Sequence, residues 1–139
     1  MIENNQISKE PYIPEIKLDI DFDLAKQIEK NGYKVENWIK KCIDFGLKVE
    51  KGNIFQEIGT KNERLKISMC NFNPYPELQV SKMFDIPKKS LSKVEDLITK
   101  NNILEEPKVW IRRSITLGLI FPNVVFLKKT SRGWKDCTF

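Results

Sequence analysis

Two pairs of adjacent basic residues, Lys40-Lys41 and Arg112-Arg113, are well placed in this 139-residue sequence to bind a polyanion. They lie in nearly identical stretches, WIKKCIDFGL and WIRRSITLGL, which begin 72 residues apart. Lysine and arginine on a polar helix face supply many of the contacts that proteins make to phosphate oxygens. The two pairs are therefore candidates for contact with the phosphate backbone of DNA.

Chemistry that needs histidine is excluded, because the sequence contains none. Its absence removes the commonest general base, the Ser/His and Cys/His nucleophile pairs, and the mixed Cys/His zinc sites. The three cysteines, Cys42, Cys70 and Cys137, are widely spaced, and we interpret them as buried or partly buried thiols. We therefore expect a protein that is not an enzyme and that holds neither a metal ion nor a cofactor.

Positive charge is concentrated in the second half of the chain. The net charge is +5, and residues 78–139 hold 12 Lys/Arg against 6 Asp/Glu, whereas residues 15–72 hold 11 against 10. An uneven basic charge fits a polyanion partner such as nucleic acid.

Apolar residues make up 40% of the sequence, which is typical of a folded protein. They form no run of about 18 residues, as a membrane-spanning helix requires. The N-terminus, MIENNQISKE, lacks the apolar segment of a secretory signal. We expect an intracellular protein with no membrane partner.

A predicted β-strand precedes each of the two similar stretches. Residues 16–22 alternate strictly between apolar and polar, as a half-buried strand does, while Lys82 interrupts the alternation in residues 80–86. The predicted inward residues are Ile16, Leu18, Ile20 and Phe22 in the first strand, and Val80, Phe84 and Ile86 in the second. Neither strand can bury its apolar face alone, so we expect them to pair antiparallel with helices packed behind them.

A further helix fits between each strand and its repeated helix. The first is predicted to end before Gly32, and the second, about two turns longer, before Asn101. Pro107 suits the first position of the second repeated helix. We expect Trp38 and Trp110 to lie in the core.

Each copy ends in a predicted β-hairpin, the first around Gly-Thr-Lys-Asn and the second around Ser-Arg-Gly. The chain therefore divides into an N-terminal arm at 1–14, a first unit at 15–72, a proline-rich linker at 73–77 and a second unit at 78–139. The expected fold class is α+β. The hairpins are candidates for self-association between neighbouring molecules on DNA.

The order of these elements resembles the ribbon-helix-helix family of DNA-binding proteins. The residues that carry the resemblance are Ile16–Phe22, Leu24, Ile28, Gly32 and Trp38–Leu47 in the first unit, and Phe84–Pro87, Leu91, Val94, Leu97 and Trp110–Leu119 in the second. The family normally builds its fold from two chains, and the tandem form is similar to transcription regulators of viruses of hyperthermophilic archaea. The resemblance implies two ribbon-helix-helix repeats in an intramolecular pseudo-dimer, each followed by a hairpin. It also implies a sequence-specific regulator, most simply a repressor, which for a viral protein would act in the host cytoplasm.

In that family a two-stranded ribbon enters the major groove of double-stranded DNA, and the first turn of each second helix grips phosphate. Carried over to this chain, the base-contacting residues would be Lys17, Asp19, Asp21, Ser81, Met83 and Asp85. The phosphate-contacting residues would be Lys34, Val35, Glu36, Lys40, Lys41, Lys108, Val109, Arg112 and Arg113. The three aspartates depart from the family pattern, because carboxylates near phosphate repel.

Two other interpretations stay open. The stretch LAKQIEKNGYKVENWIKKCI also resembles a helix-turn-helix, with Gly32 in the turn and a recognition helix from Lys34, although the strand before each copy argues against it. Alternatively, the chain is a protein-interaction or virion-associated module that has kept the fold and lost DNA binding, which suits the acidic first strand.

Overall fold

The computed structural model describes residues 16–58, 63–76, 81–121 and 123–137. The predictions for the arm at 1–14, for the Gly-Thr-Lys-Asn turn at 59–62 and for Val80 lie outside these residues.

The described residues form four α-helices and two antiparallel sheets, which confirms the α+β class. The first half of the chain contains β1 (Lys17–Asp21), α1 (Phe22–Lys30), α2 (Val35–Glu50), β2 (Ile54–Ile58) and β3 (Glu63–Lys66). After the short 3-10 helix η1 (Met69–Asn71), the second half contains β4 (Ser81–Asp85), α3 (Lys88–Lys100), α4 (Pro107–Ile120), β5 (Phe126–Thr130) and β6 (Gly133–Asp136). The order strand, helix, helix, strand, strand therefore occurs twice, as the repeat predicts.

The ribbon consists of β1 and β4, which pair antiparallel as predicted. Leu18 and Ile20 on β1 are fully buried, and Phe84 on β4 is 9% exposed, because these side chains face the helices. The inward position predicted for Phe22 is wrong. The strand ends at Asp21, Phe22 begins α1, and its side chain is 45% exposed.

The hairpins β2–β3 and β5–β6 both form, and they join into one sheet with the strand order β3-β2-β5-β6. Ile54 on β2 and Phe126 on β5 are buried beneath it. The ring of Phe45 on α2 lies edge-on to Phe126 and to Phe121, with centroids 5.6 and 5.4 Å apart. Such pairs add to the energy of apolar burial and extend the core from the helices into this sheet.

In both sheets a strand of the first half pairs with the corresponding strand of the second half. In the ribbon the central pair is Asp19 with Met83, and in the larger sheet the pair at the middle of the β2–β5 ladder is Phe55 with Leu127. Phe55 and Leu127 are separated by the same 72 residues as the two repeated helices. Corresponding strands of the two halves therefore pair with each other at both ends of the molecule.

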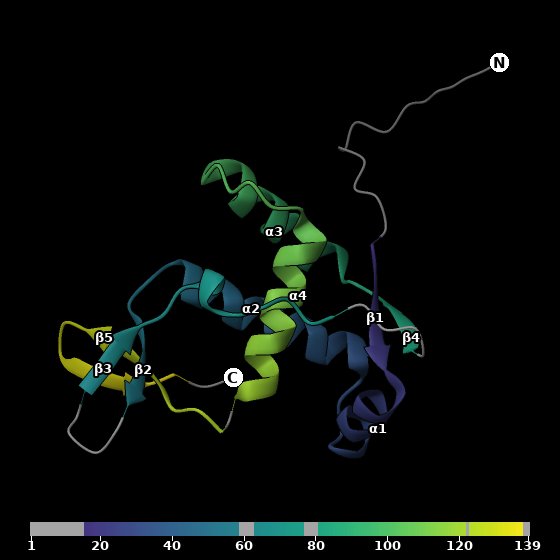
Figure 1. The fold of residues 1–139 in the computed structure, drawn as a ribbon, viewed down its shortest axis with the longest axis horizontal. Coiled ribbons are helices and arrows are strands. Elements are labelled where there is room, and N and C mark those ends of the chain that lie inside the picture. The colour runs from purple at the N-terminus through teal and green to yellow at the C-terminus, as the bar shows by residue number, and fades with distance from the viewer. Residues whose placement is uncertain (1–15, 59–62, 77–80, 122, 138–139) are drawn as a thin grey trace.

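Helices α2 and α4 lie between the ribbon and the four-stranded sheet, and α1 lies beside the ribbon (Figure 1). Helix α2 packs closely on α4 because Gly46 has no side chain. A Cβ atom there would lie 3.0 Å from Cη2 of Trp110 and 3.1 Å from Cβ of Ser114. Trp110 is 1% exposed and Trp38 is 8% exposed, which confirms both as core residues.

The helix ends follow local backbone chemistry. Gly32, after α1, has φ +89°, the left-handed region that glycine adopts without strain, and Asn102 follows α3 with φ 52°. Pro107 is the first residue of α4, as predicted. Helix α3 has 13 residues and α1 has 9, so the predicted difference of two turns is wrong, since four residues make about one turn.

Candidate nucleic-acid interface

The outward face of the ribbon carries most of the predicted base-contacting residues. Met83 is 52% exposed at its centre. At one end the side chains of Lys17 and Asp85 are 56% and 69% exposed, with Nζ and Oδ1 3.9 Å apart. An ion pair this exposed contributes little to stability, so both side chains can rearrange toward a ligand. Asp21 and Ser81, at the other end, are half-buried.

Asp19 departs from this pattern. Its register places it on the outward side opposite Met83, yet it is only 7% exposed and interacts with other groups of the chain. A side chain so buried presents little surface to a base edge.

The ribbon, residues 16–21 and 81–86, holds two lysines, Lys17 and Lys82, against three aspartates, so its net charge is −1.

The first turns of α2 and α4 are the predicted phosphate sites. Lys34, the residue before α2, and Glu36 are exposed, but Val35 is buried at 1% exposure and belongs to the core. Lys108 and Val109 are half-buried at the start of α4. In neither helix does the side chain of the N-cap residue accept a hydrogen bond from the first turn. The first N–H groups of both helices can therefore still donate to an oxyanion.

The two basic pairs have different environments. Lys40 is solvent-exposed and pairs with Oδ2 of Asp44 at 3.0 Å, and Nζ of Lys41 lies 5.5 Å above the ring of Tyr33. Arg112 is 9% exposed, and its Nε donates to the carbonyl oxygen of Tyr75 at 2.6 Å. The interpretation that both pairs lie on a solvent-facing side of their helices is therefore wrong for Arg112.

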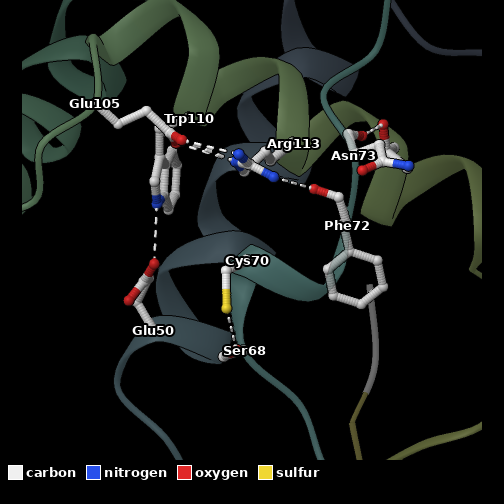
Figure 2. A network of polar contacts seen from close by, with 9 residues as sticks. Glu50, Ser68, Cys70, Phe72, Asn73, Glu105, Trp110 and Arg113 are labelled. Carbon is white, nitrogen blue, oxygen red and sulfur yellow. Dashed lines mark hydrogen bonds and ion pairs between the residues drawn. The ribbon is translucent and has the colours of Figure 1, made fainter.

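Arg113 is also engaged within the protein (Figure 2). Its Nε donates to both carboxylate oxygens of Glu105, at 3.1 and 3.0 Å, and Nη1 donates to the carbonyl of Phe72 at 2.6 Å. Nearby, Nε1 of Trp110 donates to Oε1 of Glu50 at 3.1 Å. These bonds tie α4 to α2 and to the segment after η1, so Arg113 has a structural role in this network.

The segment 73–76 of the predicted linker is bonded to α4. The N–H of Tyr75 donates to the carbonyl of Arg112 at 2.9 Å, and Oγ1 of Thr116 donates to the carbonyl of Asn73 at 2.6 Å. The backbone N–H of Asp21, at the end of β1, donates to Oη of Tyr75 at 3.1 Å. Tyr75 therefore joins α4 to the edge of the ribbon.

The titration of Tyr75 gives one testable consequence. Burial raises its pKa, and the negative charges of Asp21 and Asp19 raise it further, while the hydrogen bond from the Asp21 N–H opposes them. The pKa of Tyr75 in the folded protein is above the value of about 10 in the unfolded chain. The folded state therefore favours the protonated phenol, and its full stabilising effect is present below about pH 10. It is lost as the pH rises through the folded pKa.

We expect unfolding experiments to show that stability falls less steeply above about pH 10 in Tyr75→Phe than in the wild type. Tyrosinate absorbance should show the corresponding high-pH step in the wild type and lose it in Tyr75→Phe. Tyr33→Phe, which changes an exposed ring, is the control. An unchanged titration in Tyr75→Phe would contradict the assignment.

The cysteines agree only in part with the prediction. All three are free thiols, and burial raises the pKa of Cys42 and of Cys137. Cys70, in η1, is exposed, and its Sγ is 3.0 Å from Oγ of Ser68 (Figure 2). Within the described residues no group of three or more Cys, Asp or Glu side chains is arranged to hold a metal ion, and no helix has the length and apolar composition of a membrane span.

The basic segment KKTSRGWK, residues 128–135, forms parts of β5 and β6 and the turn between them. On the four-stranded sheet four basic residues of the second half (Lys128, Lys129, Arg132 and Lys135) join two of the first half (Arg64 and Lys66), together with Glu57, Glu63 and Asp136. Trp134 lies among them, with Cζ of Arg64 and Nζ of Lys129 4.4 and 4.8 Å from its ring centroid. The ribbon is thus the acidic end of the described chain, and this sheet is the basic end.

Comparisons with protein-family models, curated proteins and solved structures find no match to this chain.

Proposed function

We propose that the protein binds double-stranded DNA as a single-chain ribbon-helix-helix regulator and acts as a repressor by occupying promoter DNA. The observation that supports this most directly is the ribbon. Its strands pair symmetrically about Asp19 and Met83, bury one face on the helices and leave Lys17, Met83 and Asp85 exposed on the other. A two-stranded ribbon fits the major groove, which is about 12 Å wide.

The accessible side chains have suitable chemistry for reading bases. Lys17 can donate to the acceptors of guanine, Met83 can contact a thymine methyl group, and Ser81 can donate or accept. Asp85 can accept from the amino group of cytosine, although it also opposes phosphate. The first turns of α2 and α4, with Lys40 and Lys41, would contact the backbone.

We expect duplex DNA to bind in a fluorescence anisotropy titration, with an affinity that falls steeply between about 50 and 200 mM salt. Lys17→Ala should weaken binding about tenfold, because it removes a base contact and a positive charge. Asp85→Asn should strengthen it, because the ribbon loses a carboxylate that repels phosphate and partly neutralises Lys17. Both positions are exposed, so neither change disturbs the core.

Lys100→Ala is the matched control, since it removes an equally exposed lysine from the end of α3, away from the ribbon. If all three variants bind duplex DNA as the wild type does, the ribbon is not the interface. If no duplex binds at micromolar protein and low salt, the regulator proposal is wrong. If only Lys40→Ala and Lys41→Ala weaken binding, α2 acts as the recognition helix of a helix-turn-helix.

A protein-interaction module is the second candidate, and the net negative charge of the ribbon favours it. An acidic strand pair with exposed Met83 at its centre suits a basic protein surface better than phosphate. In that case Asp85→Asn would weaken binding to the partner, whereas the DNA proposal expects the same change to strengthen binding to duplex.

A further inference from the structure

A cavity of about 440 Å³ lies at the far end of α2 from the ribbon. Its wall is formed where the C-terminal end of α2 meets the start of β2, the middle of β5 and the end of β6. This volume falls within the range of small-ligand sites in proteins, about 300–1,000 Å³. The phosphate contacts proposed for α2 and α4 all lie in the first half of each helix, so this cavity is separate from them.

Three lysines line the cavity, two from the C-terminal end of α2 and one from β5. Lys48 belongs to the last turn of α2, Lys51 follows that helix, and Lys128 lies on β5 opposite Ile54. Lys66 adds to them, because its Nζ lies 4.0 Å from the position of a Cβ atom on Gly52 in the cavity wall. No sequence motif predicts this group, because its members are brought together by the pairing of β2 with β5.

Among the residues that the structure describes, positive charge exceeds negative charge at the cavity. Asp136 is the single carboxylate among the eight lining residues, all of them described, against three lysines. Within the described part of the chain none of Lys48, Lys51 and Lys128 forms an ion pair. The C-terminal dipole of α2 offsets about half a charge. Several positive charges around one cavity raise the local concentration of anions.

Cys137 also lines the cavity, and two of the lysines affect the pKa of its thiol. Burial raises the pKa of its thiol, and the positive charges of Lys48 and Lys128 act in the opposite direction.

We propose that this cavity binds a small phosphate-bearing ligand, either free phosphate or a phosphate monoester, with Lys48, Lys51 and Lys128 as its donors. Lysine is a common ligand of phosphate groups and acts as a compact point charge. The concave shape favours a small ligand over the extended backbone of a nucleic acid. The proposal does not depend on DNA binding by the ribbon.

Isothermal titration calorimetry at low salt, with inorganic phosphate, pyrophosphate and adenosine monophosphate as probes, tests the site. We expect saturable binding to the full chain with one site per molecule. The double variant Lys48→Gln/Lys128→Gln should weaken binding at least about tenfold, since it removes two of the three charges. Lys26→Gln/Lys100→Gln, which removes two exposed lysines elsewhere, should bind as the wild type does.

Alkylation of Cys137 by iodoacetamide gives a second measurement. In a Cys70→Ser background the remaining described thiol, Cys42, is fully buried. A bound phosphate covers Cys137 and screens the lysines that lower its pKa, so we expect phosphate to slow the alkylation. Chloride at the same ionic strength is the control anion, and it should leave the rate of alkylation unchanged, whereas sulfate, which is also a tetrahedral dianion, should compete with phosphate.

Three outcomes would overturn the proposal. The first is the absence of saturable binding with any probe up to about 10 mM. The second is equal weakening in the control double variant, which would show that only net charge matters. The third is a loss of duplex DNA binding in Lys48→Gln/Lys128→Gln with no binding of the small probes, which would assign the lysines to a nucleic-acid surface.

Discussion

Trp110→Ala is expected to lower the free energy of unfolding by about 3–5 kcal/mol, a large part of the total stability of a small domain. The indole is 1% exposed and fills the crossing of α2 and α4, where Gly46 leaves room for it. Its removal leaves a cavity that the helices cannot close without moving, and it deprives Glu50 of a hydrogen bond donor. Urea denaturation followed by circular dichroism measures the loss.

Trp110→Phe is the matched comparison for this prediction. The smaller ring fills part of the space but lacks Cη2, the atom nearest Gly46, and loses the bond to Glu50, so we expect an intermediate loss of about 1–2 kcal/mol. Leu104→Ala changes a fully exposed side chain and should have almost no effect. A loss in Trp110→Ala no larger than that in Leu104→Ala would show that the two helices do not pack through this residue.

Arg112→Ala is expected to lower the free energy of unfolding by about 2–3 kcal/mol, because a charge-assisted hydrogen bond to a buried carbonyl is lost. The Nε of Arg112 donates to the carbonyl of Tyr75 at 2.6 Å, and no water can easily replace a donor that is 9% exposed. Since Tyr75 also bonds the edge of β1, hydrogen exchange at the Asp21 N–H should become faster.

Lys40 occupies the equivalent position in the other half and supplies the control. It is exposed, and its pair with Asp44 is of the i,i+4 type that contributes about 0.3–0.5 kcal/mol. Lys40→Ala should therefore change stability by less than about 0.5 kcal/mol. Equal losses in Arg112→Ala and Lys40→Ala would contradict the structural role of Arg112.

The elements that could be predicted from the sequence are those whose signals are local. Strict alternation in residues 16–22 predicts a strand because successive side chains point to opposite faces, and the structure confirms its pairing with residues 81–85. Glycine and asparagine after α1 and α3 mark the helix ends because they tolerate positive φ. These signals depend on a few neighbouring residues and not on the rest of the fold.

What could not be predicted depends on contacts between distant segments. Nothing in the hairpin sequences indicates that β2 pairs with β5, and this pairing creates the lysine-lined cavity. The pairs Lys40-Lys41 and Arg112-Arg113 look equivalent in sequence, yet only Arg112 meets the carbonyl of Tyr75. Sequence similarity between two positions does not imply that their surroundings are similar.

The pairing of corresponding strands at both ends also affects synthesis of the chain. β1 gains its partner only when β4, about 60 residues later, has left the ribosome, and β2 waits equally long for β5. During that time the apolar faces of Leu18, Ile20 and Ile54 lack their native cover. Such long-range pairings slow folding and expose strand edges to aggregation. The nascent first half therefore exposes apolar surface until the second half is made, and translation speed should affect the yield of folded protein.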